Sequence, residues 1–234
     1  MQEVNLQEIQ DKLYEKLKVA GWGPATVNFV ASSDFFSILK TLLKESQDGK
    51  RFTPQVKNLF RAFEECPYDK VKVVIVGQDP YPQIGVADGI AFSCSNTGRI
   101  EKSLEYIYQS IKDTVDPNYE GDPDLKRWSN QGVLLLNCAL TVTTNKPGAH
   151  QLLWKPFTTQ LLDYLIWNKQ GLIYVFLGKK AAEYAELIPD NHFKILLSHP
   201  ASAAYNHEES WDCGDIWNKI NQQLSKNDQR IITW

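Results

Sequence analysis

The sequence predicts an α/β fold in a single domain, with a central four-stranded parallel sheet flanked by helices on both faces. Four short apolar runs have the length and composition of buried strands, and helical patterns separate them along the chain. Such alternation is typical of parallel sheets with right-handed crossovers. No repeat, linker or low-complexity tract divides the 234 residues. We therefore interpret 1–234 as one domain, with a helical N-terminal extension at 1–30.

The N-terminal third of the chain is predicted to be helical, because apolar side chains recur there at helical spacing. Three stripes are present: Leu6, Ile9, Leu13 and Leu17; Phe35, Phe36, Leu39 and Leu43; and Val56, Leu59, Phe60 and Phe63. Each stripe indicates a helix that buries one face against the core.

The remainder alternates between strands and helices. The predicted strands lie at 72–76, 133–136, 172–177 and 194–197. Two helical stripes fall between them: Leu104, Ile107, Tyr108 and Ile111, and then Phe157, Leu161, Leu162 and Leu165. The strands are short and rich in branched aliphatic residues, as expected for strands that are buried on both faces.

Composition excludes several classes of protein. No run of 18 apolar residues is present, so no membrane-spanning helix is expected, and the charged N-terminus does not resemble a signal peptide. The four cysteines are widely spaced, which argues against a zinc or iron–sulfur site and indicates free thiols in a reducing compartment. The net charge of −3 does not indicate nucleic-acid binding by the whole surface, but a local patch can still bind phosphates.

Polar residues follow each predicted strand directly. The first strand runs into Gly77-Gln78-Asp79, where we expect Gly77 to permit a turn and the prolines beyond to stiffen it. Asn137 and His199 follow two of the other strands. Each has an ordinary alternative role: a turn carboxylate, a cap or a hydrogen-bonded loop histidine. Because ligands bind at the carboxyl ends of parallel strands, their meeting at one edge favours a functional site.

Five segments in unbroken order resemble the family 1 uracil-DNA glycosylases. They are GQDPYP at 77–82, GIAFS at 89–93, SLEYIYQSI at 103–111, QGVLLLNCALTV at 131–142 and HPASAAYN at 199–206. The resemblance covers the chain from about Phe35 to Trp234. It implies that the protein flips uracil out of DNA and hydrolyses the bond to deoxyribose, leaving an abasic site, without a cofactor or a metal.

The resemblance also implies roles for the catalytic residues. Asp79 is expected to stabilise the cationic sugar and to orient the attacking water. His199 is expected to donate a hydrogen bond to uracil O2, and Gln78 to add its backbone N–H beside the same oxygen.

Three further residues are expected to recognise the base. The amide of Asn137 matches the N3–H donor and O4 acceptor of uracil, whereas cytosine presents the reverse pattern. Tyr81 is expected to lie against uracil C5 and to exclude the methyl group of thymine. Phe92 is expected to stack on the flipped base. Simple core packing is the alternative for both aromatic residues.

The expected DNA contacts are less specific. Short hydroxyl side chains in the matched loops are suited to phosphate oxygens, namely Ser93, Ser103, Ser198 and Ser202. Lys102, Lys179 and Lys180 are candidates for local positive charge.

The chain departs from the family pattern in three places. Pro82 replaces a histidine, and residues 99–102 replace a proline-rich loop. Ala203 stands where a leucine normally wedges into the base stack, with Tyr205 as a candidate substitute. We therefore expect a preference for single-stranded substrate, which requires less unstacking.

Two other functions compete with uracil excision. One is a glycosylase-derived DNA-binding or replication scaffold with weak activity, which the altered loops leave open. The other is an unrelated small-molecule hydrolase, but the chain has no GxSxG nucleophile elbow. The expected partners are uracil-containing DNA, glycosylase inhibitor proteins and replication proteins. The protein is expected to be a monomer in the cytoplasm, or in the nucleus of a eukaryotic host.

Overall fold

The four predicted strands form one parallel sheet in a computed structural model of the chain, which describes residues 4–206 and 210–234. The strands are β2 (Val73–Gly77), β3 (Val133–Asn137), β5 (Ile173–Leu177) and β6 (Phe193–Leu197), in the spatial order β3-β2-β5-β6. All three pairings are parallel. The predicted sheet is confirmed, and the predicted strand ends agree to within one residue.

Burial explains the composition of these strands. Every residue of β2, β3 and β5 is buried, which matches their continuous apolar sequences. Strand β6 lies at an edge of the sheet, and its residues are only partly buried. Strand β6 therefore differs in burial from the other three strands of the sheet.

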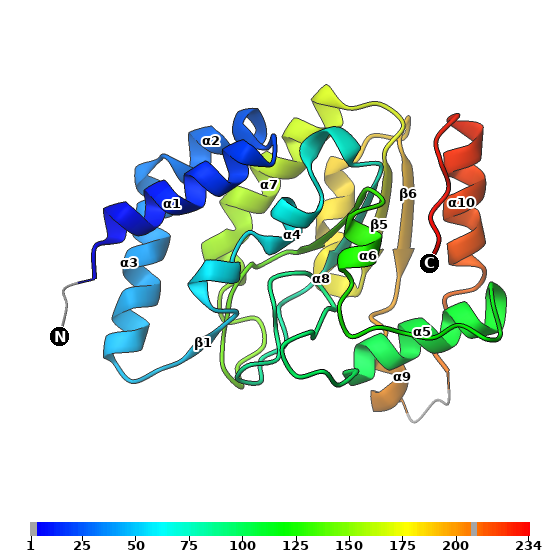
Figure 1. The fold of residues 1–234 in the computed structure, drawn as a ribbon, viewed down its shortest axis with the longest axis horizontal. Coiled ribbons are helices and arrows are strands. Elements are labelled where there is room, and N and C mark those ends of the chain that lie inside the picture. The colour runs from blue at the N-terminus through cyan, green and yellow to red at the C-terminus, as the bar shows by residue number, and fades with distance from the viewer. Residues whose placement is uncertain (1–3, 207–209) are drawn as a thin grey trace.

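Helices cover both faces of the sheet. The longer ones are α1 (Leu6–Val19), α2 (Gly23–Val30), α3 (Ser33–Gln47), α5 (Lys102–Thr114), α7 (Gln151–Asn168) and α10 (Ile216–Lys226). Four are short: α4 (Arg61–Glu65), α6 (Lys126–Ser129), α8 (Lys179–Ala182) and α9 (Ser202–Tyr205). Helices α1, α2, α3 and α7 lie on one side of the sheet and α10 lies on the other (Figure 1).

The predicted N-terminal helices are packed onto the rest of the domain. Helix α1 begins after Asn5, whose side chain accepts a hydrogen bond from the Glu8 backbone N–H at 3.2 Å. Leu13, Leu17 and Trp22 belong to the same hydrophobic cluster as the strands. The helical extension therefore contributes to the core.

One predicted helix is wrong in its extent. The stripe from Val56 to Phe63 is split into a 3₁₀ turn at Val56–Asn58 and helix α4, because Phe60 has a non-helical backbone (φ −111°, ψ 20°). A two-stranded antiparallel ladder, β1 (Phe52–Thr53) with β4 (Val142–Thr143), was not predicted. Two-residue strands carry no periodic signal in the sequence.

The four cysteines are free, as predicted, and the structure shows that all four are buried. Within the described residues, no helix is long and apolar enough to cross a membrane.

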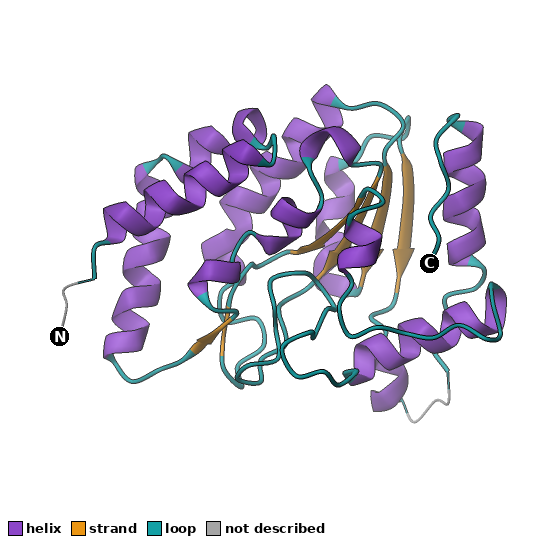
Figure 2. Cartoon of the chain, in the orientation of Figure 1, coloured by secondary structure: helices purple, strands orange, loops and turns teal. Residues whose placement is uncertain are grey.

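The topology places a crevice at the carboxyl edge of the sheet. The chain passes from β2 to its neighbour β3 and then crosses to β5 on the other side of β2. Such a reversal of strand order opens a ligand-binding crevice at the carboxyl ends. Loop segments gather beyond the arrowheads of the strands, beside α5 and α9 (Figures 1 and 2).

Candidate active site

A cleft at this edge brings together most of the predicted site residues. Gly77 and Asn137 end adjacent strands and are register partners, and His199 follows β6. The cleft is lined by the predicted residues Gln78, Asp79, Tyr81, Phe92, Ser103, His199 and Ser202. Asn137 lines a small cavity behind it, together with Tyr81 and Phe92. The predicted meeting of these side chains at one edge is confirmed.

Gly77 is required because two side chains approach its Cα closely. A Cβ at this position would lie 2.8 Å from Oδ1 of Asn137 and 3.0 Å from Cζ of Phe92. Its φ is not among the positive values, so the expectation that glycine is needed there for the turn is wrong. The absent side chain lets the amide and the aromatic ring converge on the strand end.

Asp79 is held through one of its oxygens. Its Oδ2 accepts hydrogen bonds from the Gly148 backbone N–H at 2.6 Å and from Nε2 of Gln78 at 2.8 Å. Its Oδ1 is buried and has no hydrogen-bond partner within residues 4–206 and 210–234. A buried acceptor without a partner is costly unless a bound molecule satisfies it. This oxygen therefore has an unused capacity to accept a hydrogen bond, in a residue that lines the cleft.

His199 presents one ring nitrogen as a donor. Its Nδ1 accepts a hydrogen bond from the Ala201 backbone N–H at 3.2 Å, which places the proton of the neutral ring on Nε2. Burial lowers the pKa of His199 below its usual value, so the ring is neutral at neutral pH. Gly178 lies behind it with φ +96°, and a Cβ there would lie 3.0 Å from the His199 Cβ.

Phe92 adopts an unusual backbone conformation, with φ +66°. Non-glycine residues occupy this left-handed region at a cost, and such strain concentrates at functional sites. The Tyr81 hydroxyl donates to the Phe92 carbonyl at 3.1 Å. Burial raises the pKa of Tyr81 well above its usual value, so the hydroxyl stays protonated and remains a donor. The Phe92 ring lies 5.8 Å from the His199 ring, measured between centroids.

Asn137 is nearly buried, with 8% of its surface exposed. In the part of the chain that the structure describes, no hydrogen bond engages its side-chain amide. The cap role considered from the sequence is therefore not observed. Both the amide donor and the carbonyl acceptor remain available to a ligand.

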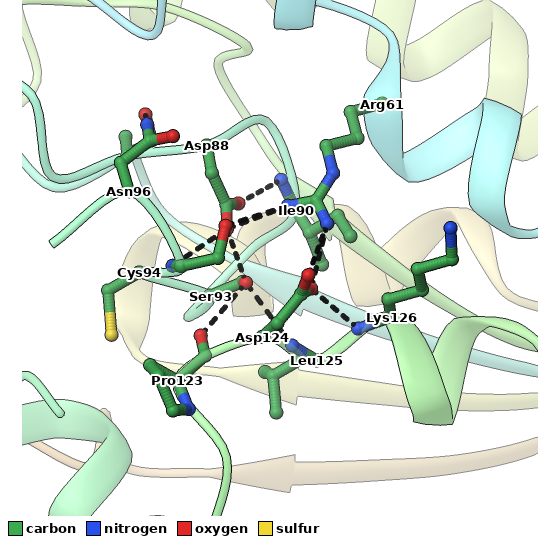
Figure 3. Close-up of polar contacts among 12 residues, drawn as sticks. Arg61, Asp88, Ile90, Ser93, Cys94, Asn96, Pro123, Asp124, Leu125 and Lys126 are labelled. Carbon is green, nitrogen blue, oxygen red and sulfur yellow. Dashed lines mark hydrogen bonds and ion pairs between the residues drawn. The ribbon is translucent and has the colours of Figure 1, made fainter. Parts of the chain in front are cut away.

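Two of the predicted DNA contacts are contradicted. Ser93 is fully buried; its hydroxyl donates to Asp88 Oδ2 at 2.6 Å and accepts from the Leu125 backbone N–H at 3.2 Å (Figure 3). Ala203 is also fully buried and faces the core rather than the surface. Neither residue can contact a nucleic acid in this conformation.

The other predicted contacts remain accessible or untested. Ser103 and Ser202 line the cleft, and Ser198 is exposed, with its Oγ accepting from Nε1 of Trp211 at 3.0 Å. Tyr205 belongs to α9, but its side chain lies outside the described residues.

Sequence reasoning missed Gly148, whose backbone N–H binds Asp79. Gly148 has φ +82° and lies in a turn before α7, after Asn145, which has φ +60°. The run Asn145-Lys146-Pro147-Gly148 is a strong turn signal and could have identified this loop. Its approach to Asp79 could not have been predicted, because it depends on tertiary packing. Among residues 4–206 and 210–234, no group of three or more metal-ligating side chains occurs.

Comparisons with known proteins all indicate the same family. The family model described as the Uracil DNA glycosylase superfamily matches residues 63–221. The uracil-DNA glycosylase of Azobacteroides pseudotrichonymphae is 35% identical over 86% of this chain and 91% of its own length. Uracil-DNA glycosylase 2 of Bacteroides fragilis is 34% identical over 86% of this chain and 91% of its own length.

Solved structures show the same fold. The crystal structure of mimivirus uracil-DNA glycosylase superposes with a TM-score of 0.78 at 27% identity, covering 93% of this chain and 88% of that chain. A variant of the mimivirus enzyme in complex with UGI superposes with a TM-score of 0.80 at 28% identity, covering 93% and 90%.

Proposed function

This chain belongs to the uracil DNA glycosylase superfamily and excises uracil from DNA, and on that premise we propose that the cleft at the carboxyl edge of the sheet binds the flipped base and hydrolyses its glycosidic bond. The base must leave the duplex before the enzyme can reach the bond, at a cost of a few kcal/mol. The proposal assigns the chemistry to Asp79 and His199, and recognition of the base to the residues around Phe92.

Asp79 acts on the sugar side of the bond. Positive charge develops on deoxyribose as the bond between uracil N1 and C1′ stretches, and a preorganised carboxylate stabilises that charge. The two hydrogen bonds to Oδ2 hold the group in place. The free Oδ1 then accepts a hydrogen bond from the attacking water, which it orients toward C1′.

His199 acts on the leaving base. Negative charge develops on uracil O2, and the Nε2–H of the neutral imidazole donates to it. Gln78 contributes its backbone N–H to the same oxygen. A neutral donor requires no protonation step at neutral pH, which agrees with the lowered pKa of His199.

Three residues select uracil. The free amide of Asn137 pairs with N3–H and O4, so cytosine would leave buried polar groups unpaired, at about 1–3 kcal/mol each. Tyr81 blocks a methyl group at C5, and Phe92 stacks on the base face with an energy of about 1–3 kcal/mol.

The partners follow from this activity. The substrate is uracil-containing DNA, contacted through phosphates by Ser103, Ser198 and Ser202. UGI is bound in a structure of the mimivirus enzyme, and we propose that inhibitor proteins of this kind also bind this chain. We further propose that the chain acts as a monomer where the cell keeps its DNA: the cytoplasm of a bacterium or of an infected host cell, or the nucleus of a eukaryote.

The observation that carries the proposal is that one cleft is lined by Asp79, whose Oδ1 has no hydrogen-bond partner in the described chain, and by His199, whose Nε2 carries the proton. The test is incubation with an oligonucleotide that contains one uracil, followed by alkali to cleave abasic sites. Cleavage at the uracil that persists in excess EDTA supports the proposal. Absence of cleavage on both single and double strands contradicts it. The alternative of a weakly active scaffold has no support among the relatives named above.

A further inference from the structure

A buried carboxylate lies at the root of the loop that carries Phe92. Asp88 is 1% exposed and is paired with Arg61, whose Nη1 lies 2.7 Å from its Oδ2. Figure 3 shows the Arg61 guanidinium between Asp88 and a second carboxylate, Asp124. Asp88 is not among the residues that line the cleft, so any influence on the reaction has to pass through its neighbours.

The Asp88 carboxylate accepts hydrogen bonds from three residues of the loop that follows it. The Ile90 backbone N–H donates to Oδ1 at 3.1 Å. The Ser93 hydroxyl donates to Oδ2 at 2.6 Å (Figure 3). The Ser95 hydroxyl, at 2.6 Å, and the Ser95 backbone N–H, at 3.0 Å, donate to the same oxygen. These donors lie on both sides of Phe92 in the sequence, so the carboxylate spans the stacking residue.

Arg61 pairs with this carboxylate and with a second one. Its Nη2 also binds both oxygens of Asp124, at 2.8 and 2.7 Å. Burial alone would lower the pKa of the Arg61 guanidinium, but the two carboxylates outweigh burial and raise the pKa above its usual value. A buried carboxylate is tolerated when it is paired and fully hydrogen-bonded, as Asp88 is.

The conformation of Phe92 needs such support. Its φ of +66° is unfavourable for an aromatic residue and persists only where the surroundings determine it. Two other bonds assist: the Ala91 backbone N–H donates to the Leu135 carbonyl at 3.1 Å, and Tyr81 donates to the Phe92 carbonyl. These two bonds hold the backbone at Phe92 and at Ala91 before it, whereas Asp88 connects residues on the two sides of Phe92.

We propose that Asp88, with Arg61, is a positioning residue for uracil recognition: it holds the 88–95 loop so that the Phe92 ring faces the flipped base. The inference rests on the proposed function, because it presupposes that Phe92 stacks on uracil. It predicts that the contribution of Asp88 to activity is made through Phe92 and disappears when the Phe92 ring is absent.

The test is a double-mutant cycle with Asp88→Asn and Phe92→Ala. Asn keeps the size of the side chain but removes the charge and places a donor toward other donors. Two quantities are measured for each variant: kcat/KM for uracil release and the inhibition constant of free uracil. Phe92→Ala is expected to lower kcat/KM and to raise the inhibition constant of uracil, each by about 5- to 160-fold, the range for one base–aromatic stack.

Asp88→Asn is expected to lower kcat/KM and to raise the inhibition constant of uracil by up to the same factor. The double variant is expected to show no further loss relative to Phe92→Ala. Additive losses in the double variant, or unchanged uracil inhibition in Asp88→Asn, would overturn the inference. A normal inhibition constant in Phe92→Ala would instead remove Phe92 from the proposed function. The two failures are therefore distinguishable.

Asp124→Asn is the matched control. It removes the charge of the other carboxylate that binds Arg61, but within residues 4–206 and 210–234 Asp124 makes no hydrogen bond to the 88–95 loop. It is expected to lower stability while uracil inhibition stays within twofold of the parent. If Asp88→Asn does not fold by circular dichroism, Ser95→Ala replaces it in the cycle. That variant removes one hydroxyl donor to Asp88, and the same two criteria decide the outcome.

Discussion

The two walls of the cleft stand on strands of different burial. Asp79 follows β2 and Asn137 ends β3, and the residues of both strands are all buried. His199 follows β6, an edge strand with partly exposed residues. Strand β2 is paired on both sides, but β6 is paired only with β5. The register of the sheet therefore determines the Asp79 wall. His199 relies on local contacts with Ala201 and Gly178.

This difference indicates where the molecule can change without losing its chemistry. The Asp79 wall retains Asp79 and Asn137 although it carries the departure at Pro82, and the segment after β6 carries the departure at Ala203. Because His199 also takes part in the reaction, we expect changes on the Asp79 wall to affect the rate most, and changes in the segment after β6 to affect stability, strand preference and pH response.

Asp79→Asn is expected to slow uracil release about 10²- to 10³-fold, because loss of one preorganised group that stabilises developing charge typically costs this much. The amide oxygen can still accept the Gly148 N–H, so the fold should be retained. Single-turnover rates measure the effect. The exposed Asp163→Asn on α7 is the matched control and should behave as the parent does. A rate within tenfold of the parent in Asp79→Asn would contradict the assignment.

Asn137→Asp is expected to lower uracil excision and to permit detectable cytosine excision. The site is nearly buried, which favours a protonated carboxyl. Its O–H can donate to N3 of cytosine, and its carbonyl oxygen can accept from the amino group. The loss on uracil is expected to correspond to about 1–3 kcal/mol, the penalty for an unpaired buried group. Release of both bases from matched oligonucleotides measures it. Full uracil activity without cytosine excision would show that Asn137 does not read the base.

The residues after strands could be placed from the sequence, because apolar runs identify parallel strands and parallel strands share one carboxyl edge. This reasoning located Asp79, Asn137 and His199 together. It could not orient Ser93, because a left-handed residue precedes it and turns its hydroxyl toward Asp88. It could not reveal that Ala203 is buried, because a four-residue helix has no periodicity to read.

Ala203→Leu is expected to destabilise the fold by about 1–3 kcal/mol, because it inserts a larger side chain into a packed site. Because position 203 faces the core, a leucine there would not reach the base stack. Urea unfolding measures the change. Ala204→Leu, at the next and partly exposed position, is the matched control and should stay within about 0.5 kcal/mol of the parent. Equal stability of both variants would contradict the burial of Ala203.

The edge wall is also expected to determine strand preference. Position 203 is buried and supplies no wedge into the base stack, so extrusion of a paired base is expected to be poorly supported, and rates should fall from single-stranded uracil to U·G and then to U·A, by about tenfold overall. Single-turnover rates on the three substrates decide this. Equal rates would show that another residue supports extrusion, and Tyr205→Ala should then reduce duplex activity selectively.

The smallest expected effect is the response of His199 to pH. Burial lowers its folded-state pKa below the unfolded value of about 6.5, so the unfolded chain binds the proton first as pH falls. Its contribution to stability is therefore present above about pH 6.5 and is lost as pH falls through the folded pKa.

Protonation also turns Nδ1 into a donor facing the Ala201 N–H, which should weaken the alignment of Nε2. NMR titration of the ring and urea unfolding at several pH values measure both effects, with His199→Gln as the control that should lose this pH dependence. A ring that titrates above pH 6.5 would show that the edge wall holds a charged histidine and that the neutral donor assigned to uracil O2 is wrong.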